Sequence, residues 1–88
     1  TTSSDVTFNL DFIDTTYHGI YAMEYKDANF YFLGVDTTYN DIIIITNNMF
    51  EVTAIDTIPD STVVGFCFKG NDLFLSYRNK IIERWKTY

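Results

Sequence analysis

Three residues near the end of the sequence have side chains that together suit a sugar: Arg78, Glu83 and Trp85. An indole ring stacks on the C–H face of a sugar, while a guanidinium and a carboxylate bond the hydroxyl groups at its edge. Glu83 and Trp85 also alternate onto one face of an extended segment, so this face could instead pack against a neighbouring sheet. We expect packing in preference to sugar binding, and both interpretations stay open.

A second group of candidate binding residues lies in two loops that both read DTTY, Asp14 to Tyr17 and Asp36 to Tyr39. Binding residues concentrate on loops held by a rigid scaffold, and we expect these loops and Arg78 to form one polar, aromatic rim. Each Asp-Thr pair is alternatively a turn former whose side chains bond the nearby backbone. The candidate ligand-binding residues are Trp85, Glu83, Arg78, Tyr39, Tyr17 and Asp36.

No residue pattern indicates a catalytic site, a metal site or a cofactor. His18, the only histidine, has no serine or cysteine nucleophile at a recognisable spacing, so we expect it to be a loop residue. Cys67, the only cysteine, lies in a strand pattern and is expected to be a buried, inert thiol. The scattered aspartates lack the close D-x-D-x-D-G series of calcium sites. We therefore expect a protein that is not an enzyme.

A unit that occurs twice must position these residues. Val64 to Leu75 (VGFCFKGNDLFL) repeats the pattern of Tyr21 to Phe32 (YAMEYKDANFYF) 43 positions earlier: an alternating run, a two-residue polar turn and an apolar run. Upstream, Phe8 to Thr15 and Phe50 to Thr57 share Phe, Ile, Asp and Thr at a spacing of 42. A unit of 42 to 43 residues falls in the range of four-stranded propeller blades.

The strands of this unit differ in how far each must be buried. Ile42 to Ile45 and Phe30 to Leu33 are apolar on both faces, whereas Val6 to Ile13 and Phe50 to Ile55 alternate as outer strands with one wet face. The segment 79–88 fits either a helix or a strand, and its correspondence with the isoleucine strand favours a strand. This gradient from doubly buried to partly wet strands indicates sheets stacked face to face in a ring.

The layout resembles the β-propeller superfamily in period and pattern, although the Gly-His and Trp-Asp dipeptides of its commonest repeat family are absent. Lys80 to Trp85, KIIERW, is similar to the strand with Ile, Glu and Trp in two-blade fucose-binding lectins of bacteria and fungi. Those lectins assemble into six-bladed rings. Ile42 to Thr46 has neither Glu nor Trp, so the resemblance implies at most one sugar site per chain.

We predict one all-β domain over residues 1–88, with two four-stranded, blade-like repeats at about 8–49 and 50–88 and a flexible tail at 1–5. Two blades cannot close a ring, because each blade needs a neighbour on both faces. The chain, which begins at Thr1, is therefore expected to be a piece of a longer propeller or to form a homo-oligomer. A trimer is favoured, with Val6 to Ile13 completing a neighbour's last blade. The alternative is an eight-stranded barrel or sandwich closed within one chain.

Composition limits the possible partners. Twelve acidic against six basic residues give a net charge of -6, which disfavours nucleic acid and favours neutral or cationic partners. No apolar run approaches the ~18 to 20 residues of a membrane span, and one cysteine leaves the compartment open. The leading hypothesis is a non-enzymatic recognition or scaffold module that binds a partner protein through its loop rim or within a larger assembly. The alternatives are a carbohydrate-binding lectin and a small acidic inhibitor.

Overall fold

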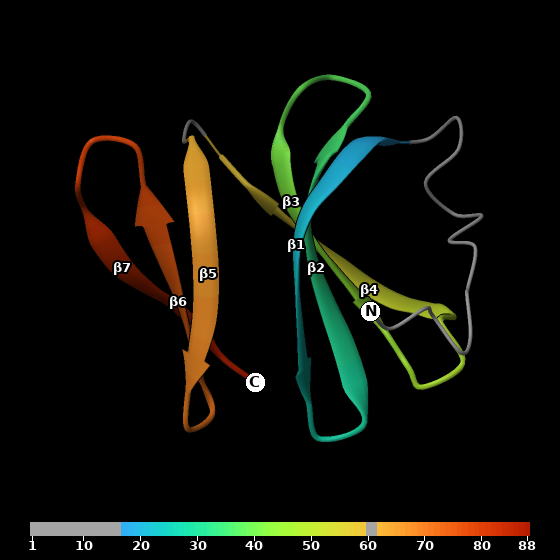
Figure 1. Cartoon of the computed structure of the whole chain (residues 1–88). Helices are drawn as coiled ribbons and strands as arrows, with labels where there is room; N and C mark the ends of the chain where they lie inside the picture. The colour runs from blue at the N-terminus through green and yellow to red at the C-terminus, as the bar shows by residue number, and fades with distance from the viewer. Residues whose placement is uncertain (1–16, 60–61) are drawn as a thin grey trace, which may run out of the picture.

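The computed structural model describes residues 17–59 and 62–88, which form antiparallel strands and no helix (Figure 1). The strands are β1 (Tyr17–Lys26), β2 (Asn29–Asp36), β3 (Asp41–Thr46), β4 (Val52–Ile58), β5 (Val63–Lys69), β6 (Asp72–Tyr77) and β7 (Ile82–Thr87). They make two sheets, a first sheet in the order β1-β2-β3-β4 and a second sheet in the order β5-β6-β7. The all-β prediction is confirmed, and so is a strand within 79–88.

Some sequence predictions concern residues that the structure does not describe, and others need correction. The expected strand Val6 to Ile13, the first DTTY loop as far as Thr16 and the tail at 1–5 lie outside the described residues. The outer strand expected at Phe50 to Ile55 begins later and extends to Ile58, because Phe50 has a φ of 60° and still belongs to the turn. The barrel alternative is wrong for the described strands, which form two separate sheets.

Both sheets begin with a two-residue hairpin turn. Asp27 and Ala28 connect β1 to β2, and Gly70 and Asn71 connect β5 to β6. Asp27, Ala28 and Gly70 have φ values of 51°, 68° and 63°, the left-handed geometry that tight hairpins need. The two predicted hairpins are therefore confirmed.

The register of the two hairpins is the same at a spacing of 43 residues. Each of three successive pairs in the first hairpin has a counterpart in the second: Met23–Phe32 and Phe66–Leu75, Glu24–Tyr31 and Cys67–Phe74, Tyr25–Phe30 and Phe68–Leu73. The register also shifts at the same place in both, at Tyr21 in β1 and at Val64 in β5. A bulge is a specific local feature, so its recurrence indicates equivalent backbones rather than a shared alternation alone.

The isoleucine strand is covered on both faces, as predicted. Ile43 and Ile45 belong to the core between the two sheets, while Ile42 and Ile44 belong to a smaller core on the opposite face of the first sheet. All four side chains are buried. A strand buried on both faces needs apolar residues at every position, which is why alternation is lost here.

The main core lies between the stacked sheets (Figure 1). Its buried residues come from β2, β3 and β4 of the first sheet and from β5 and β6 of the second: Tyr31, Leu33, Ile43, Ile45, Ile58, Val63, Leu73 and Leu75. β1 lies beside β5. At the other end of the stack, β4 meets the end of the chain through the hydrogen bond that Tyr88 donates to Asp56.

Equivalent residues of the two sheets do not face each other. Leu75 points from the second sheet toward the first, whereas its counterpart Phe32 lies on the far side of the first sheet. Tyr31 points from the first sheet toward the second, and its counterpart Phe74 lies on the outer side of the second sheet. The sheets therefore stack front to back. A sandwich with two-fold symmetry would instead bring equivalent residues together.

We call the side of each sheet that carries Phe32 or Leu75 its front face, and the side that carries Tyr31 or Phe74 its back face. The back face of the first sheet packs on the front face of the second. The back face of the second sheet is an outer surface of the stack, whereas the front face of the first sheet is buried at its centre and exposed along β1.

Candidate functional site

Several connecting segments gather at one end of the stack, opposite the two-residue hairpin turns (Figure 1). We call this end the loop rim; its described residues are 37–40 between β2 and β3, 78–81 between β6 and β7, and Pro59 and Thr62 of the link from β4 to β5. The link and the last loop are joined, since the Arg78 backbone N–H donates to the Thr62 carbonyl at 3.2 Å. Tyr17 begins β1 at this end, opposite Asp36. The second DTTY loop and the loop with Arg78 therefore share one end, whereas the first DTTY loop lies outside the described residues as far as Thr16.

The Asp36 side chain stabilises the β2–β3 loop by accepting hydrogen bonds from residues of that loop. Its carboxylate accepts the backbone N–H groups of Thr38 and Asn40, both at 2.9 Å, and the Thr38 hydroxyl at 2.9 Å. The N–H of Asn40 contributes most to lowering the pKa of Asp36 below its ordinary value, and the bonds from Thr38 add to this effect. Asp36 is thus a turn former, the alternative that its sequence context offered.

The same backbone turn occurs three times in the described chain, with a left-handed residue at its fourth position. That residue is Tyr39 in the β2–β3 loop, Phe50 in the β3–β4 loop and Lys80 in the β6–β7 loop, with φ values of 64°, 60° and 72°. Phe50 stacks on Phe30 with ring centroids 4.6 Å apart, which accounts for a large ring there. Tyr39 is instead 76% exposed. Left-handed geometry costs a non-glycine residue about 1–2 kcal/mol.

The three residues that suited a sugar have different surroundings in the structure. Trp85 is half-buried and packs against the core between the sheets. Its indole N–H is buried and has no hydrogen bond of good geometry, although its interaction with Tyr88 acts to lower the pKa of that residue. Glu83 accepts a hydrogen bond from the Tyr77 hydroxyl at 2.6 Å. Arg78 is exposed on its loop.

Sequence reasoning missed the polar contacts that join the two sheets. The Asp41 carboxylate accepts the Val63 backbone N–H at 2.9 Å in a buried position. The Lys26 ammonium donates to the Asn71 side chain at 2.7 Å and lies 5.7 Å from the Phe68 ring centroid. A single sequence gives no signal for such pairs, because the partners lie about twenty or more positions apart.

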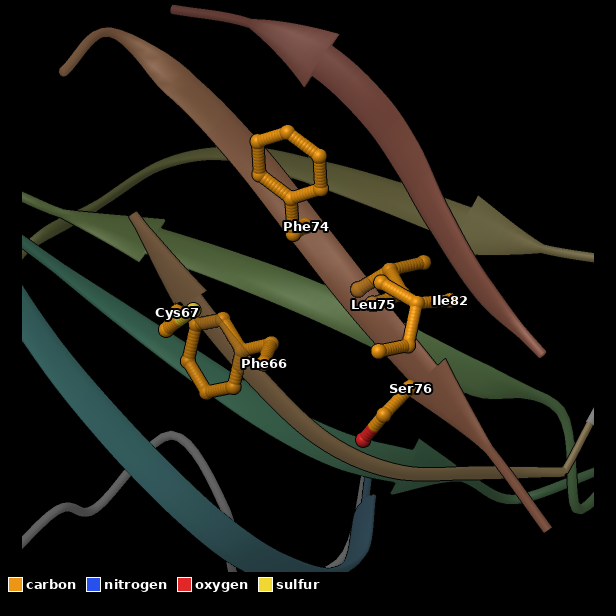
Figure 2. A pocket seen from close by; sticks show the side chains of 6 residues that line it. All are labelled: Phe66, Cys67, Phe74, Leu75, Ser76 and Ile82. Atoms are coloured by element: carbon orange, nitrogen blue, oxygen red, sulfur yellow. The ribbon is translucent and has the colours of Figure 1, made fainter. Parts of the chain in front are cut away.

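Cys67 corrects a prediction, because it is exposed rather than buried. It lies on the back face of the second sheet, where an open apolar hollow of about 200 Å³ is formed (Figure 2). The hollow is lined by Phe66, Cys67, Phe74, Leu75, Ser76 and Ile82. Alternation correctly placed Cys67 on a strand, but it gave no information about whether anything covers that face.

The described residues hold no cluster of metal-binding side chains. Within residues 17–59 and 62–88, no group of three or more His, Cys, Asp and Glu side chains is placed to hold a metal ion. No helix in the same ranges could cross a membrane. Searches against protein-family models, curated proteins and solved structures found no match to this chain. Functional inference therefore starts from the geometry of the loop rim and the outer faces.

Proposed function

We propose that this protein is a non-enzymatic recognition module that binds a partner protein through its loop rim, with Tyr39 and Arg78 as contact residues. The observation that carries the proposal is the exposed ring of Tyr39 on a left-handed backbone held by Asp36. Backbone strain of this kind clusters at functional sites. A tyrosine held on an ordered loop offers a large contact area at a low entropic cost, and Tyr and Arg are enriched in binding hot spots.

The proposed partner is a neutral or cationic protein segment, because the chain carries a net charge of -6. The scaffold is proposed to be two propeller-like repeats that assemble into a homo-oligomer, with a trimer favoured. Front-to-back stacking of equivalent hairpins supports this organisation. A carbohydrate site gains no support, since Trp85 packs against the core. No observation favours the inhibitor.

Measuring the free energy of unfolding of loop variants tests whether Tyr39 makes the protein less stable than glycine would at this position. Tyr39→Gly is expected to raise the free energy of unfolding by about 0.5 to 1 kcal/mol, because glycine accepts a positive φ. Lys80→Gly changes the equivalent position of the β6–β7 loop and is expected to give a similar gain. Urea unfolding of both variants measures these gains. A loss of stability in Tyr39→Gly would show that the ring supports the fold.

The affinity of loop variants for peptides then tests the role of the loop rim in binding. Random peptides displayed on phage are selected on the wild-type protein, and the dissociation constants of synthetic peptides are measured by calorimetry. Tyr39→Gly and Arg78→Ala are expected to weaken binding about tenfold, which corresponds to about 1.4 kcal/mol, whereas Tyr21→Phe, at an exposed position outside the loop rim, leaves binding unchanged. Selected peptides that bind Tyr39→Gly and Arg78→Ala as tightly as the wild type would refute the loop-rim proposal.

A further inference from the structure

The contact between the two sheets shows how a back face and a front face fit together in this protein. On the back face of the first sheet, Tyr31 packs edge-on against Phe68 of the second sheet, with ring centroids 4.7 Å apart. Lys26 extends from the same face to the hairpin turn of the second sheet, where it bonds Asn71. The contact thus combines an aromatic pair with a lysine that reaches over the turn.

The outer back face of the second sheet carries the counterparts of these residues without a covering sheet. Phe74 corresponds to Tyr31 and lines the apolar hollow, and Lys69 corresponds to Lys26 and is exposed. Ile82 at the rim of the hollow is 72% exposed. Beside this face, β7 pairs only with β6 among the described strands. Exposed apolar surface next to an unpaired strand edge is typical of an interface.

The outer front face of the first sheet carries the counterparts of the other side of the contact. Phe66 and Phe68 are half-buried and pack against the core between the sheets. Their counterparts in β1 are Met23 and Tyr25, which are 54% and 57% exposed. The centre of this face is already buried, so the margin along β1 is the part that remains available. Asp27, in the adjacent turn, is exposed and forms an ion pair with Lys26.

We propose that the back face of the second sheet binds the front face of the first sheet of a second copy of this chain. In this contact Phe74 packs on Tyr25 of the second copy, as Tyr31 packs on Phe68 within the chain. Lys69 reaches the turn of the second copy, where Asp27 offers an opposite charge. The proposal rests on the proposed repeat organisation and does not depend on partner binding at the loop rim.

The contact joins two different surfaces, so each copy keeps one available β1 margin and one available back face until a ring closes. Association of this kind continues head to tail instead of stopping at a symmetric dimer. It also accounts for Cys67, whose strand pattern is that of a buried residue but whose face is uncovered in one chain.

Sedimentation velocity over a wide range of protein concentration tests the proposal. We expect the wild-type chain to form oligomers larger than a dimer, and Phe74→Asp to weaken association by more than tenfold, because it buries an unpaired charge. Asn79→Asp adds the same charge in the β6–β7 loop, keeps an oxygen that can accept the Ile81 N–H, and should associate like the wild type. A wild-type chain that stays monomeric overturns the proposal. This outcome includes the case in which another segment of a longer protein covers this face.

A second measurement does not depend on a variant that folds. Cys67 is the only thiol, so its rate of reaction with a thiol reagent reports directly on the hollow. The rate is expected to fall as protein concentration rises, and Ile82→Asp, at an already exposed position, should restore the rapid reaction. A rate that is independent of concentration while oligomers form would show that another surface associates. Loss of peptide binding in Tyr39→Gly with unchanged oligomers would leave this proposal intact.

Discussion

At the scale of single residues, the contact between Asp56 and the end of the chain shows how charge stabilises the stacked sheets. Tyr88 donates to the Asp56 carboxylate at 2.6 Å, and Lys86 approaches the same carboxylate at 3.0 Å. Burial alone would raise the pKa of Asp56, but the bonds from Tyr88 and Lys86 and the charge of Lys86 hold it below the ordinary value of 3.8. Burial, followed by the bond to Asp56, raises the pKa of Tyr88 above its ordinary value of 10.0.

These opposite pKa shifts limit the contact to a pH window. Asp56 has a lowered pKa, so its contribution to stability is present above pH 3.8 and is lost as pH falls through the folded pKa. Tyr88 has a raised pKa, so its contribution is present below pH 10.0 and is lost as pH rises through the folded pKa. Together, the two groups support stability between these limits.

Tyr88→Phe tests this window. At neutral pH we expect the free energy of unfolding to fall by about 1 kcal/mol, the usual contribution of one hydrogen bond. We also expect a weaker loss of stability above pH 10 than in the wild type, because the shifted hydroxyl is gone. Urea unfolding as a function of pH measures both effects, with Tyr21→Phe at an exposed position as the matched control. Equal alkaline slopes for the wild type and Tyr88→Phe would contradict the assignment.

At the scale of elements, the two hairpin turns differ in residues and in the number of left-handed positions: Asp27 and Ala28 both have a positive φ in the first turn, whereas only Gly70 has one in the second. Ala28 has a φ of 68° in the β1–β2 turn, while Gly70 provides a φ of 63° in the β5–β6 turn. Nothing lies within 4 Å of the position of a Cβ at Gly70, so the backbone angle alone sets the cost of a side chain there. The first hairpin therefore carries strain that the second avoids.

One substitution in each turn measures this strain. We expect Ala28→Gly to raise the free energy of unfolding by about 1 kcal/mol and Gly70→Ala to lower it by a similar amount. Ala22→Gly, within β1, is the control and should lower stability, because glycine is unfavourable in a strand. Thermal unfolding of the three variants tests the signs. If Ala28→Gly and Ala22→Gly destabilise the protein equally, the turn carries no backbone strain.

At the scale of the whole molecule, neither sheet has a complete core without the other. Leu73 and Leu75 have no exposed surface, and the residues that cover them come from the first sheet. Asp41 also reaches across to bond Val63 in a buried position. The two sheets should therefore unfold in one cooperative transition.

Trp85, the only tryptophan, reports on this cooperativity from β7. We expect its fluorescence and the far-ultraviolet circular dichroism to change at the same urea concentration. Asp41→Ala should shift both transitions downward together, because it leaves the buried Val63 N–H unpaired. A fluorescence transition that precedes the dichroism change would show that the second sheet separates before the first sheet unfolds.

The sequence alone determined the elements that depend on local pattern. Alternation and turn residues predicted both hairpins, and the run Ile42 to Ile45 predicted a strand covered on two faces. Correspondence between the repeats identified 79–88 as containing a strand. These predictions succeeded because strand pairing in a hairpin and the two-residue period of side chains are set by neighbouring residues.

Only the tertiary structure decided which faces meet. The period of a strand shows that Phe74 and Ser76 share a face, but burial of that face depends on contacts with residues far away in the sequence. For this reason Cys67 was expected to be buried and is exposed, while Trp85 was a candidate ligand platform and packs against the core. The three residues that suited a sugar in the sequence have different roles in the structure. Arg78 lies on a loop, Glu83 makes a side-chain contact, and Trp85 packs against the core.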